Sequence, residues 1–349
     1  MIKLNPLTIE KFNRFKSIKR GYYSLWTICI LIVLSLFAEM LVNNRALLVK
    51  YNNTYYFPTY GSIIPGSEFG LEYEYETNYK ELKIKFESEG SGSFVVLPPV
   101  PYNPFETNFK DGFFPPFPPS LTQKHYFGTD KSGRDVLARL VYGFRIAIFF
   151  SLILLTLNYI IGITVGCFMG YVGGKFDLFL QRIIEIWNNI PYLYAIIIIS
   201  SIVIPDFFSL LGIMVFFGWI GMTWYMRTAT YKEKERDYVM AARVTGASTA
   251  RIIFRHILPN TVSVIITFAP FAIAGGITAL TALDYLGFGM PPPTPSWGQL
   301  LSEASEYNIT APWIGASVIS ALIIVLTMVT FIGEAVRESF DPKRFITYE

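Results

Sequence analysis

The sequence predicts an α-helical integral membrane protein, and three observations support this fold class. Only 16% of the 349 residues are charged and 52% are hydrophobic, whereas an ordinary soluble domain is about 25% charged. The apolar residues gather in long runs, and a helix of about 20 such residues spans the ~30 Å hydrocarbon core of a bilayer. Lysines and arginines lie between the runs in alternate loops. We therefore expect about six transmembrane helices rather than two soluble domains.

The first predicted helix covers residues 22–42 and follows a basic stretch from Lys3 to Arg20. This arrangement is similar to a signal peptide, but the run is long enough to span a membrane and no small-x-small cleavage site follows it. We expect it to be retained. Five further runs must be helical in lipid, where exposed backbone finds no partner. They lie at about 146–171, 189–204, 207–226, 261–286 and 313–333.

The positive charges predict the orientation of the chain. Lysine and arginine occupy the N-terminal stretch, the loops containing Lys175–Arg182 and Arg227–Arg255, and the tail with Arg337. The short loops around Asp206 and at 288–311 contain neither residue. Because short cytoplasmic loops carry the excess of positive charge, both termini are expected in the cytoplasm.

The segment 43–142 is expected to form an insert on the outer side. It is rich in Tyr, Phe, Pro and Glu, and a loop of this length is translocated whatever its charge. Alternating side chains predict short strands at 82–86 and 93–97. The proline-rich run 113–119 excludes regular helix and central strand. We expect an irregular cap over the outer mouth, and a flexible linker is the alternative, which the aromatic content disfavours.

These elements divide the chain into four parts. Residues 1–42 contain the N-terminus and the first helix, 43–142 the insert, 143–335 a five-helix core, and 336–349 a cytoplasmic tail. Within the core, the basic loop 228–260 is expected in the cytoplasm.

The sequence lacks the common motifs of catalysis. Gly174-Lys175 is followed by phenylalanine and is not part of a phosphate-binding loop, and neither H-E-x-x-H nor G-x-S-x-G occurs. His125 and His256 are the only histidines, and no cluster has metal-ligand spacing. We expect no catalytic residue, metal or cofactor in this chain. The small net charge of +3 argues against a nucleic-acid partner.

The cytoplasmic loop contains a segment suited to docking. The sequence predicts a helix carrying Ala241 and Ala242 that breaks at Gly246, and a second helix that ends before Pro259. Small side chains let a partner's backbone approach closely. From the residues alone, an amphipathic loop lying on anionic lipid is an equal alternative.

The segment resembles the EAA loop of ABC importer permeases, with Met240 where glutamate is usual. This resemblance implies a coupling helix that docks into a cytoplasmic ATPase subunit, and that subunit would bind the ATP and magnesium. The coupling residues it implies are Ala241, Ala242, Gly246, Ala247, Arg251, His256 and Pro259.

Two further stretches narrow the family. The stretch 127–137 is similar to the G-T-D-x-x-G-R-D signature of dipeptide/oligopeptide/nickel permeases, and 283–298 resembles a second motif of that group, with Asp284 replacing a usual serine. The resemblance implies a fixed structural element at the outer face, although turns and caps alone would also use such residues. The signature residues are Gly128, Thr129, Asp130, Gly133, Arg134 and Asp135.

The stretches 20–26, 55–58 and 68–70 look like the Yej-type branch, which imports peptides and peptide-nucleotide antibiotics of the microcin C kind. The resemblance implies a type I ABC importer permease fold with an extra N-terminal helix and a periplasmic insert, in a bacterial inner membrane. It also implies a homologous second permease chain, a cytoplasmic ABC ATPase, a periplasmic peptide-binding protein and surrounding membrane lipid. An ATP-independent channel or a secondary transporter is the alternative.

Several residues within the apolar runs are candidates for packing or gating. Gly162, Gly166 and Gly170 recur every four residues and predict close approach of a neighbouring helix. Pro270 and Gly275-Gly276 predict a kink, with a hinge beside the pore as the alternative. Asp284 is a pore candidate, and its place near the end of a run allows simple solvation instead.

Overall fold

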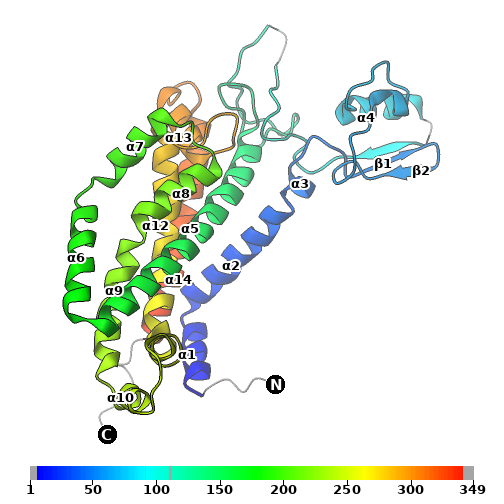
Figure 1. Cartoon of the computed structure of the whole chain (residues 1–349). Helices are drawn as coiled ribbons and strands as arrows, with labels where there is room; N and C mark the ends of the chain where they lie inside the picture. Colours follow the sequence, from blue (N-terminus) through cyan, green and yellow to red (C-terminus); the bar gives the residue numbers. More distant parts are fainter. Residues whose placement is uncertain (1–5, 91, 110–111, 341–349) are drawn as a thin grey trace.

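The computed structural model describes residues 6–340, except 91 and 110–111, as a helical bundle with a small mixed insert beside one end (Figure 1). The predicted tail 336–349 is helical as far as Phe340, and the rest of it lies outside the described residues. Both ends of the described chain lie at the end of the bundle opposite the insert. The bounds of the bundle helices are α5 Val136–Val172, α8 Phe207–Gly218, α9 Ile220–Lys234, α12 Leu258–Tyr285 and α14 Pro312–Phe340.

The centre of the bundle is the contact between α5 and α9. Gly162, Gly166 and Gly170 of α5 lie against the backbone of α9 and its N-cap residue. A Cβ on Gly162 would lie 2.7 Å from the Trp219 carbonyl oxygen, and one on Gly170 would lie 2.6 Å from that of Arg227. No side chain fits in such a space, so the prediction of close helix packing is confirmed.

Within the described residues, four helical stretches are long and apolar enough to cross a membrane: Val136–Val172, Phe207–Lys234, Thr249–Tyr285 and Pro312–Phe340. A fifth span results if α6 (Gly174–Asn188) and α7 (Tyr192–Ile202), bent by 67° relative to each other, form one crossing. The bend lies at Pro191, since proline disfavours helical backbone in the residue before it.

The predicted N-terminal span 22–42 differs from the structure. Helix α2 covers Lys19–Leu36 and breaks at Phe37, and a short α3 follows at Ala38–Leu41. Helix α2 begins with two basic residues and is not among the spans that meet the length and hydropathy test. The sixth span is therefore not confirmed by this structure. Helix α1 (Pro6–Ser17) precedes α2 at the same end of the bundle as α10.

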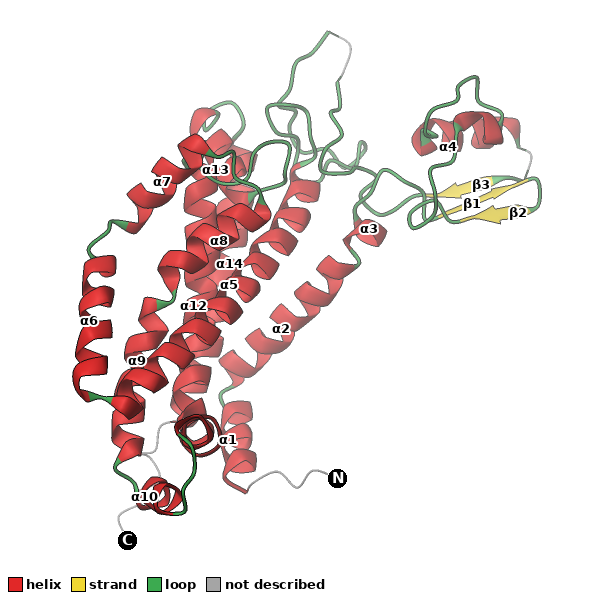
Figure 2. Ribbon diagram, viewed as in Figure 1, coloured by secondary structure: helices red, strands yellow, loops and turns green. Residues whose placement is uncertain are grey.

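The insert contains a sheet with a helix packed on it, and it ends at Asp135, before the predicted boundary at 142 (Figure 2). The strands β1 (Leu48–Tyr51), β2 (Thr54–Tyr56) and β3 (Phe94–Val96) form an antiparallel sheet in the order β2-β1-β3. The short helix η1 (Gly66–Phe69) and helix α4 (Tyr79–Glu89) lie between β2 and β3.

The predicted strand at 93–97 is confirmed as β3, but the strand at 82–86 is wrong. Leu82 and Phe86 are buried four positions apart, on one side of α4, whereas Ile84 between them is 68% exposed. This is the spacing of a helix. Asn78 caps it by accepting from the backbone N–H groups of Lys80 and Glu81, a signal that alternation alone did not reveal.

Candidate functional site

Helix α10 (Asp237–Val244) lies at the end of the bundle where the described termini lie (Figure 1). Its inner side holds Val239, which is fully buried, and Ala242, which is 8% exposed. These two pack into a cluster with Met226 of α9 and with Ile253 and Ile257 of the following helix. The inner side therefore fixes α10 to the bundle.

The other, outer side of α10 is exposed in the part of the chain that the structure describes. Val244 is 88% exposed, Met240 is 46% exposed, and Ala241 is also exposed. The predicted alanine pair is thus divided, with Ala241 facing outward and Ala242 inward. An exposed apolar surface at the end of a membrane bundle is typical of a docking site.

Gly246 ends α10, as predicted. Its φ of +79° favours glycine, and nothing lies within 4 Å of a Cβ built there. Its N–H donates to the Arg243 carbonyl at 3.0 Å, and the N–H of Ala247 donates to the Ala242 carbonyl at 3.1 Å. This pair of bonds is the Schellman termination of a helix.

The predicted end of the second helix before Pro259 is wrong. Ser248 caps α11 (Thr249–Arg251), a π-helical turn follows at Ile252–Ile257, and α12 continues directly. Pro259 lies in the first turn of α12, directly after the π-helical turn. Arg251 is exposed and His256 is partly buried. The segment that follows Gly246 therefore continues into the 37-residue helix Thr249–Tyr285 without a break.

An ion cluster joins α6 to α9 near the same end. Arg227 donates from Nε and from one terminal nitrogen to the two Asp177 carboxylate oxygens, both at 2.6 Å. The Tyr231 hydroxyl donates to the same carboxylate at 2.5 Å. A bidentate arginine–carboxylate pair fixes orientation as well as distance, so the start of α6 is tied to α9.

The signature aspartate is the centre of a second cluster at the opposite end. Asp130 is fully buried, and one of its oxygens accepts from the backbone N–H groups of Ser132 and Arg134 at 2.8 and 2.9 Å. The other accepts from Arg134 Nε at 2.7 Å and from the Arg139 guanidinium at 2.5 Å. Both carboxylate oxygens therefore have two donors each.

Helix α13 (Trp297–Glu306) completes this outer ion cluster, which we define as Asp130, Arg134, Arg139 and Glu303. Glu303 accepts from Arg139 at 3.1 Å, and Arg139 also donates to Gln299 at 3.0 Å. Burial, followed by the charge of Asp130, raises the pKa of Glu303. Arg139 and Glu303 are not among the residues predicted from the sequence, although an arginine in the first turns after the signature was a signal.

The remaining signature residues hold the loop that precedes α5 against the bundle. Asp135 caps α5 by accepting from the Ala138 N–H at 2.8 Å, and it also bonds His125 Nδ1 at 2.7 Å. The Thr129 hydroxyl accepts from the Phe117 N–H at 2.7 Å. Gly128 and Gly133 have positive φ and lie against Trp313 and Asn108, respectively, where a side chain would clash.

Asp284 lies at the outer end of α12 and is 5% exposed. It accepts from the Met290 N–H at 2.8 Å and from the Ser296 hydroxyl at 2.5 Å, and Ser296 caps α13. Trp297 then donates to the Leu140 carbonyl of α5 at 2.9 Å. These contacts tie α12, α13 and α5 together at this end. A pore role for Asp284 stays a prediction.

The hinge candidates lie inside a continuous helix. Pro270, Gly275 and Gly276 all belong to α12, which the structure shows without interruption between Leu258 and Tyr285. A Cβ on Gly276 would lie 3.0 Å from Ser151 of α5, whereas one on Gly275 would meet nothing. The structure therefore gives Gly276 a packing contact and leaves hinge motion as a prediction.

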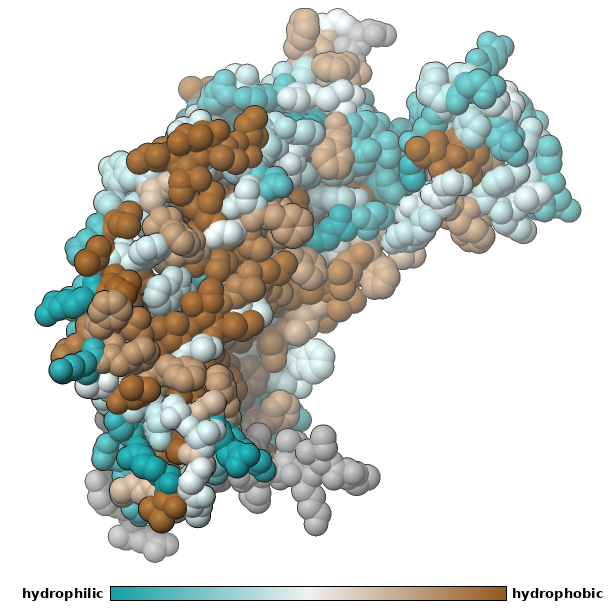
Figure 3. Space-filling view, in the orientation of Figure 1, coloured by the Kyte–Doolittle hydropathy of each residue, from teal (hydrophilic) through white to brown (hydrophobic). Residues whose placement is uncertain are grey.

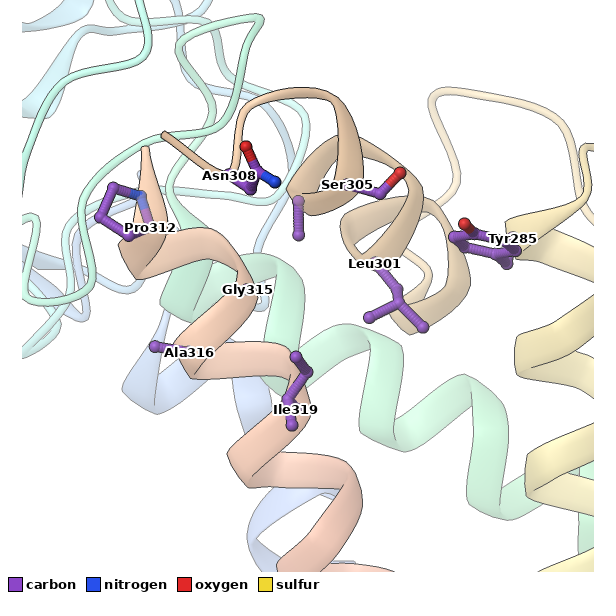
Figure 4. A pocket seen from close by; sticks show the side chains of 9 residues that line it. Tyr285, Leu301, Ser305, Asn308, Pro312, Gly315, Ala316 and Ile319 are labelled. Atoms are coloured by element: carbon purple, nitrogen blue, oxygen red, sulfur yellow. The ribbon is translucent and has the colours of Figure 1, made fainter. Parts of the chain in front are cut away.

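Two of the cavities in the described part of the chain lie against α12. The outer one, of about 480 Å³, lies where α12, α13 and α14 meet and is lined by Leu301, Gly315 and Ile319, among others (Figure 4). The other, of about 260 Å³, lies between α5, α9 and α12 beside Asn158 and Tyr225. The described residues contain no group of three His, Cys, Asp or Glu side chains placed to hold a metal ion.

The described chain is thus a bundle with at least four helical stretches able to cross a membrane, an exposed apolar helix surface at one end and a buried ion cluster at the other. Residues 162–345 match the family of binding-protein-dependent transport system inner membrane components. The chain belongs to this family and has the all-α fold of a type I ABC importer permease. It is thus a multi-pass protein of the inner membrane and a component of an ABC transport system.

The chain is also similar to individual permeases along its length. It is 39% identical to the inner membrane ABC transporter permease protein YejE of Escherichia coli (strain K12), covering 99% of this chain and 100% of the relative. It is 38% identical to the peptidoglycan transport system permease protein YejE of Agrobacterium fabrum, covering 97% and 94%. The oligopeptide transport system permease protein OppC of Lactococcus lactis is 37% identical, covering 69% and 82%.

Proposed function

We propose that this chain forms half of the translocation pore of an ATP-driven importer for peptides or peptide-like compounds. The observation that carries the proposal is the outer side of α10, where Val244 and Met240 are exposed on a helix otherwise anchored in the bundle. The oligopeptide and peptidoglycan transport titles of similar permeases support a peptide-like cargo, and microcin C-type compounds belong to the same chemical class.

The partners follow from the family and from the surfaces described above. A cytoplasmic ABC ATPase docks on α10 and binds the ATP and magnesium, so this chain needs no cofactor of its own. A homologous permease chain completes the pore, and a periplasmic peptide-binding protein delivers the cargo at the opposite end. In this arrangement both termini lie in the cytoplasm, in agreement with the basic residues near α10.

The continuous helix from Thr249 to Tyr285 provides the mechanical link. When the ATPase closes on ATP, α10 moves with it, and the packed cluster around Ile253 passes the motion to α12. At the outer end Asp284 ties α12 to α13, so displacement on the ATPase side changes the outer mouth. Alternating access follows from this coupling between two distant sites.

A matched pair of glycine substitutions tests the proposal. Gly246→Arg places a bulky charge at the docking surface, and Gly287→Arg is the control. Both glycines have φ near +80° and open space around a built Cβ, but Gly287 lies at the outer end. Because backbone strain is matched, we expect Gly246→Arg to lose co-purification with the ATPase and peptide uptake, while Gly287→Arg retains the ATPase.

Retained assembly and ATP-dependent uptake in Gly246→Arg would contradict the docking site. Uptake by the purified chain without any ATPase would instead favour an ATP-independent channel or a secondary transporter.

A further inference from the structure

The insert has two faces of different chemistry. The face of the sheet that carries Val49 and Val95 packs on α4 through Leu82 and Phe86. The strand register pairs Lys50 with both Tyr55 and Phe94, and Leu48 with Val96, so these five side chains share the opposite face. We call it the bare sheet face. Its members are Leu48, Lys50, Tyr55, Phe94 and Val96.

The bare sheet face is largely apolar, and three of its five side chains are exposed. Tyr55 is 55% exposed, Phe94 42% and Val96 41%. Its only charged residue is Lys50, whose ammonium lies 6.0 Å from the Tyr55 ring. Two aromatic rings, two aliphatic side chains and one lysine match the composition of a membrane–water interface, where rings lie at the headgroup level and lysines reach the phosphates.

The α4 side of the insert has the opposite character. Exposed glutamates cover it, and the lysines of α4 pair with some of them, as Lys83 does with Glu87. The exposed glutamates are Glu68, Glu72, Glu74, Glu81, Glu87 and Glu89. In Figure 3 hydrophilic residues cover the upper and right-hand edges of the insert, a hydrophobic patch lies at its centre, and pale to light-brown residues lie along its lower edge. An acidic side avoids anionic lipid, so the charges orient the insert with its bare sheet face toward the membrane.

Two chain segments, around Val42 and around Val100, connect the sheet to the bundle, and we call them the stem. The stem fixes the position of the sheet relative to the bundle. Val42 pairs with Val100, and the Asn43 N–H donates to the Val100 carbonyl at 3.1 Å. The Tyr142 hydroxyl of α5 donates to the Val42 carbonyl, and Arg145 bonds Glu39 at 2.7 Å. These contacts hold both chain segments of the stem against the outer ends of α3 and α5. The insert therefore has a defined position over the membrane surface.

The bare sheet face lies near the level at which α2 ends. In Figures 1 and 2 the insert extends sideways from the bundle, with α4 on the far side of the sheet from α2. Helix α2 carries an exposed apolar stripe at helical spacing that ends close to the stem. Its members are Tyr23, Trp26, Ile30, Val33 and Phe37. Exposed apolar side chains suited to lipid thus lie both along α2 and on the sheet.

We propose that the bare sheet face rests on the lipid bilayer, with Tyr55, Phe94 and Val96 at the headgroup–acyl boundary and Lys50 beside a lipid phosphate. Through this contact with lipid, the insert then stabilises the positions of α2 and of the outer end of α5 relative to the membrane. A soluble protein is disfavoured as the occupant because it would have to enter between the insert and the bilayer. The proposal needs only that the bundle spans a membrane, whatever its cargo.

Spin-label accessibility in the full chain tests the proposal. In a Cys29→Ser background, Phe94→Cys and Val96→Cys are labelled and the chain is placed in nanodiscs of phosphatidylethanolamine and phosphatidylglycerol. Ile84→Cys is the matched control, an exposed apolar position on α4. We expect labels at 94 and 96 to collide with oxygen several-fold more than with a water-soluble nickel chelate, and the label at 84 to show the reverse. Lys50→Glu should reduce this ratio with phosphatidylglycerol present and leave it unchanged in phosphatidylcholine discs.

A second measurement uses the unmodified chain. A photoreactive reagent carried on a lipid acyl chain should label Tyr55 and Phe94 and leave Ile84 unlabelled. Equal nickel accessibility at 94, 96 and 84, or no lipid labelling of the sheet, would overturn the proposal. Immobilisation of the labels only after addition of a soluble binding protein would overturn it as well and identify a protein-docking face.

Discussion

The signature around Asp130 and helix α10 are both recognisable as motifs in the sequence, but the first is buried within this chain and the second exposes one side. Asp130 is fully buried and each of its oxygens has two donors inside the chain. Val244 of α10 is 88% exposed and has no packing partner in the described part of the chain. The first motif is complete within one chain, whereas the second presents a surface that a partner would complete.

This difference separates two kinds of constraint. Replacing a member of a buried charge cluster leaves other charges unpaired and costs folding free energy. Replacing an exposed side chain changes little in the isolated chain and acts only on assembly. Stability and ATPase association should therefore respond independently at the two ends of the molecule.

The largest expected effect is from Asp130→Ala. The change leaves Arg134 and Arg139 buried without their shared carboxylate, and breaking a buried ion pair costs about 3–5 kcal/mol. We expect a large fall in the thermal midpoint of the purified chain in detergent. Lys131→Ala is the control, because the Lys131–Glu306 pair is exposed and should cost less than about 1 kcal/mol. Equal midpoints for the two variants would show that the cluster is not structural.

A smaller loss is expected on the inner side of α10. Val239→Ala removes apolar volume from a fully buried position, at a cost of about 2 kcal/mol. The thermal midpoint should fall moderately, and the ATPase should still co-purify once the folded fraction is taken into account. A loss of ATPase binding as complete as that of a substitution on the outer side would contradict the division of α10 into two sides.

The pH dependence of stability tests the environment of Glu303. Because burial and the Asp130 charge raise its pKa above the ordinary value of 4.5, the folded chain binds this proton more tightly than the unfolded chain. The contribution of this group to stability is therefore greatest below pH 4.5 and falls as the pH rises from there through the folded pKa. Glu303→Gln lacks this titration. The thermal midpoint of the native chain minus that of the variant should decrease over this range, and a constant difference would contradict the shift.

The smallest effect on stability is expected from Val244→Asp. The side chain is exposed, so the thermal midpoint of the isolated chain should correspond to a change within about 0.5 kcal/mol. Association with the ATPase should nevertheless be lost, because the change buries an unpaired carboxylate at the interface. A destabilised chain, or one that still binds the ATPase, would remove the distinction between the two regions.

Much of the fold could be predicted from the sequence because long apolar runs have few alternatives in lipid. Gly162, Gly166 and Gly170 predicted close approach of a neighbouring helix, and the structure identifies that helix as α9. The errors lie where the local pattern was ambiguous. Residues 82–86 alternate like a strand, but the Asn78 cap and the burial of Leu82 with Phe86 form a helix. Pro259 was expected to follow a helix, and instead it lies in the first turn of α12.

The candidate sites were predictable as motifs and not as contacts. The outer ion cluster depends on Glu303, which is distant in the sequence from Asp130 and enters through the folding of α13. The division of the alanine pair depends on how α10 is rotated against Ile253, which no local pattern specifies. Tertiary packing therefore decided both the membership of the ion cluster and the rotation of α10.

The most direct test of the docking surface is a site-specific cross-link in membranes that contain the whole transport system. Cysteines are introduced one at a time at positions 244 and 239 in the Cys29→Ser background and are treated with a short thiol-to-amine reagent. The structure predicts that Val244→Cys cross-links to the cytoplasmic ATPase and that Val239→Cys, being buried against the bundle, does not. A cross-link from position 239, or none from position 244, would contradict the account.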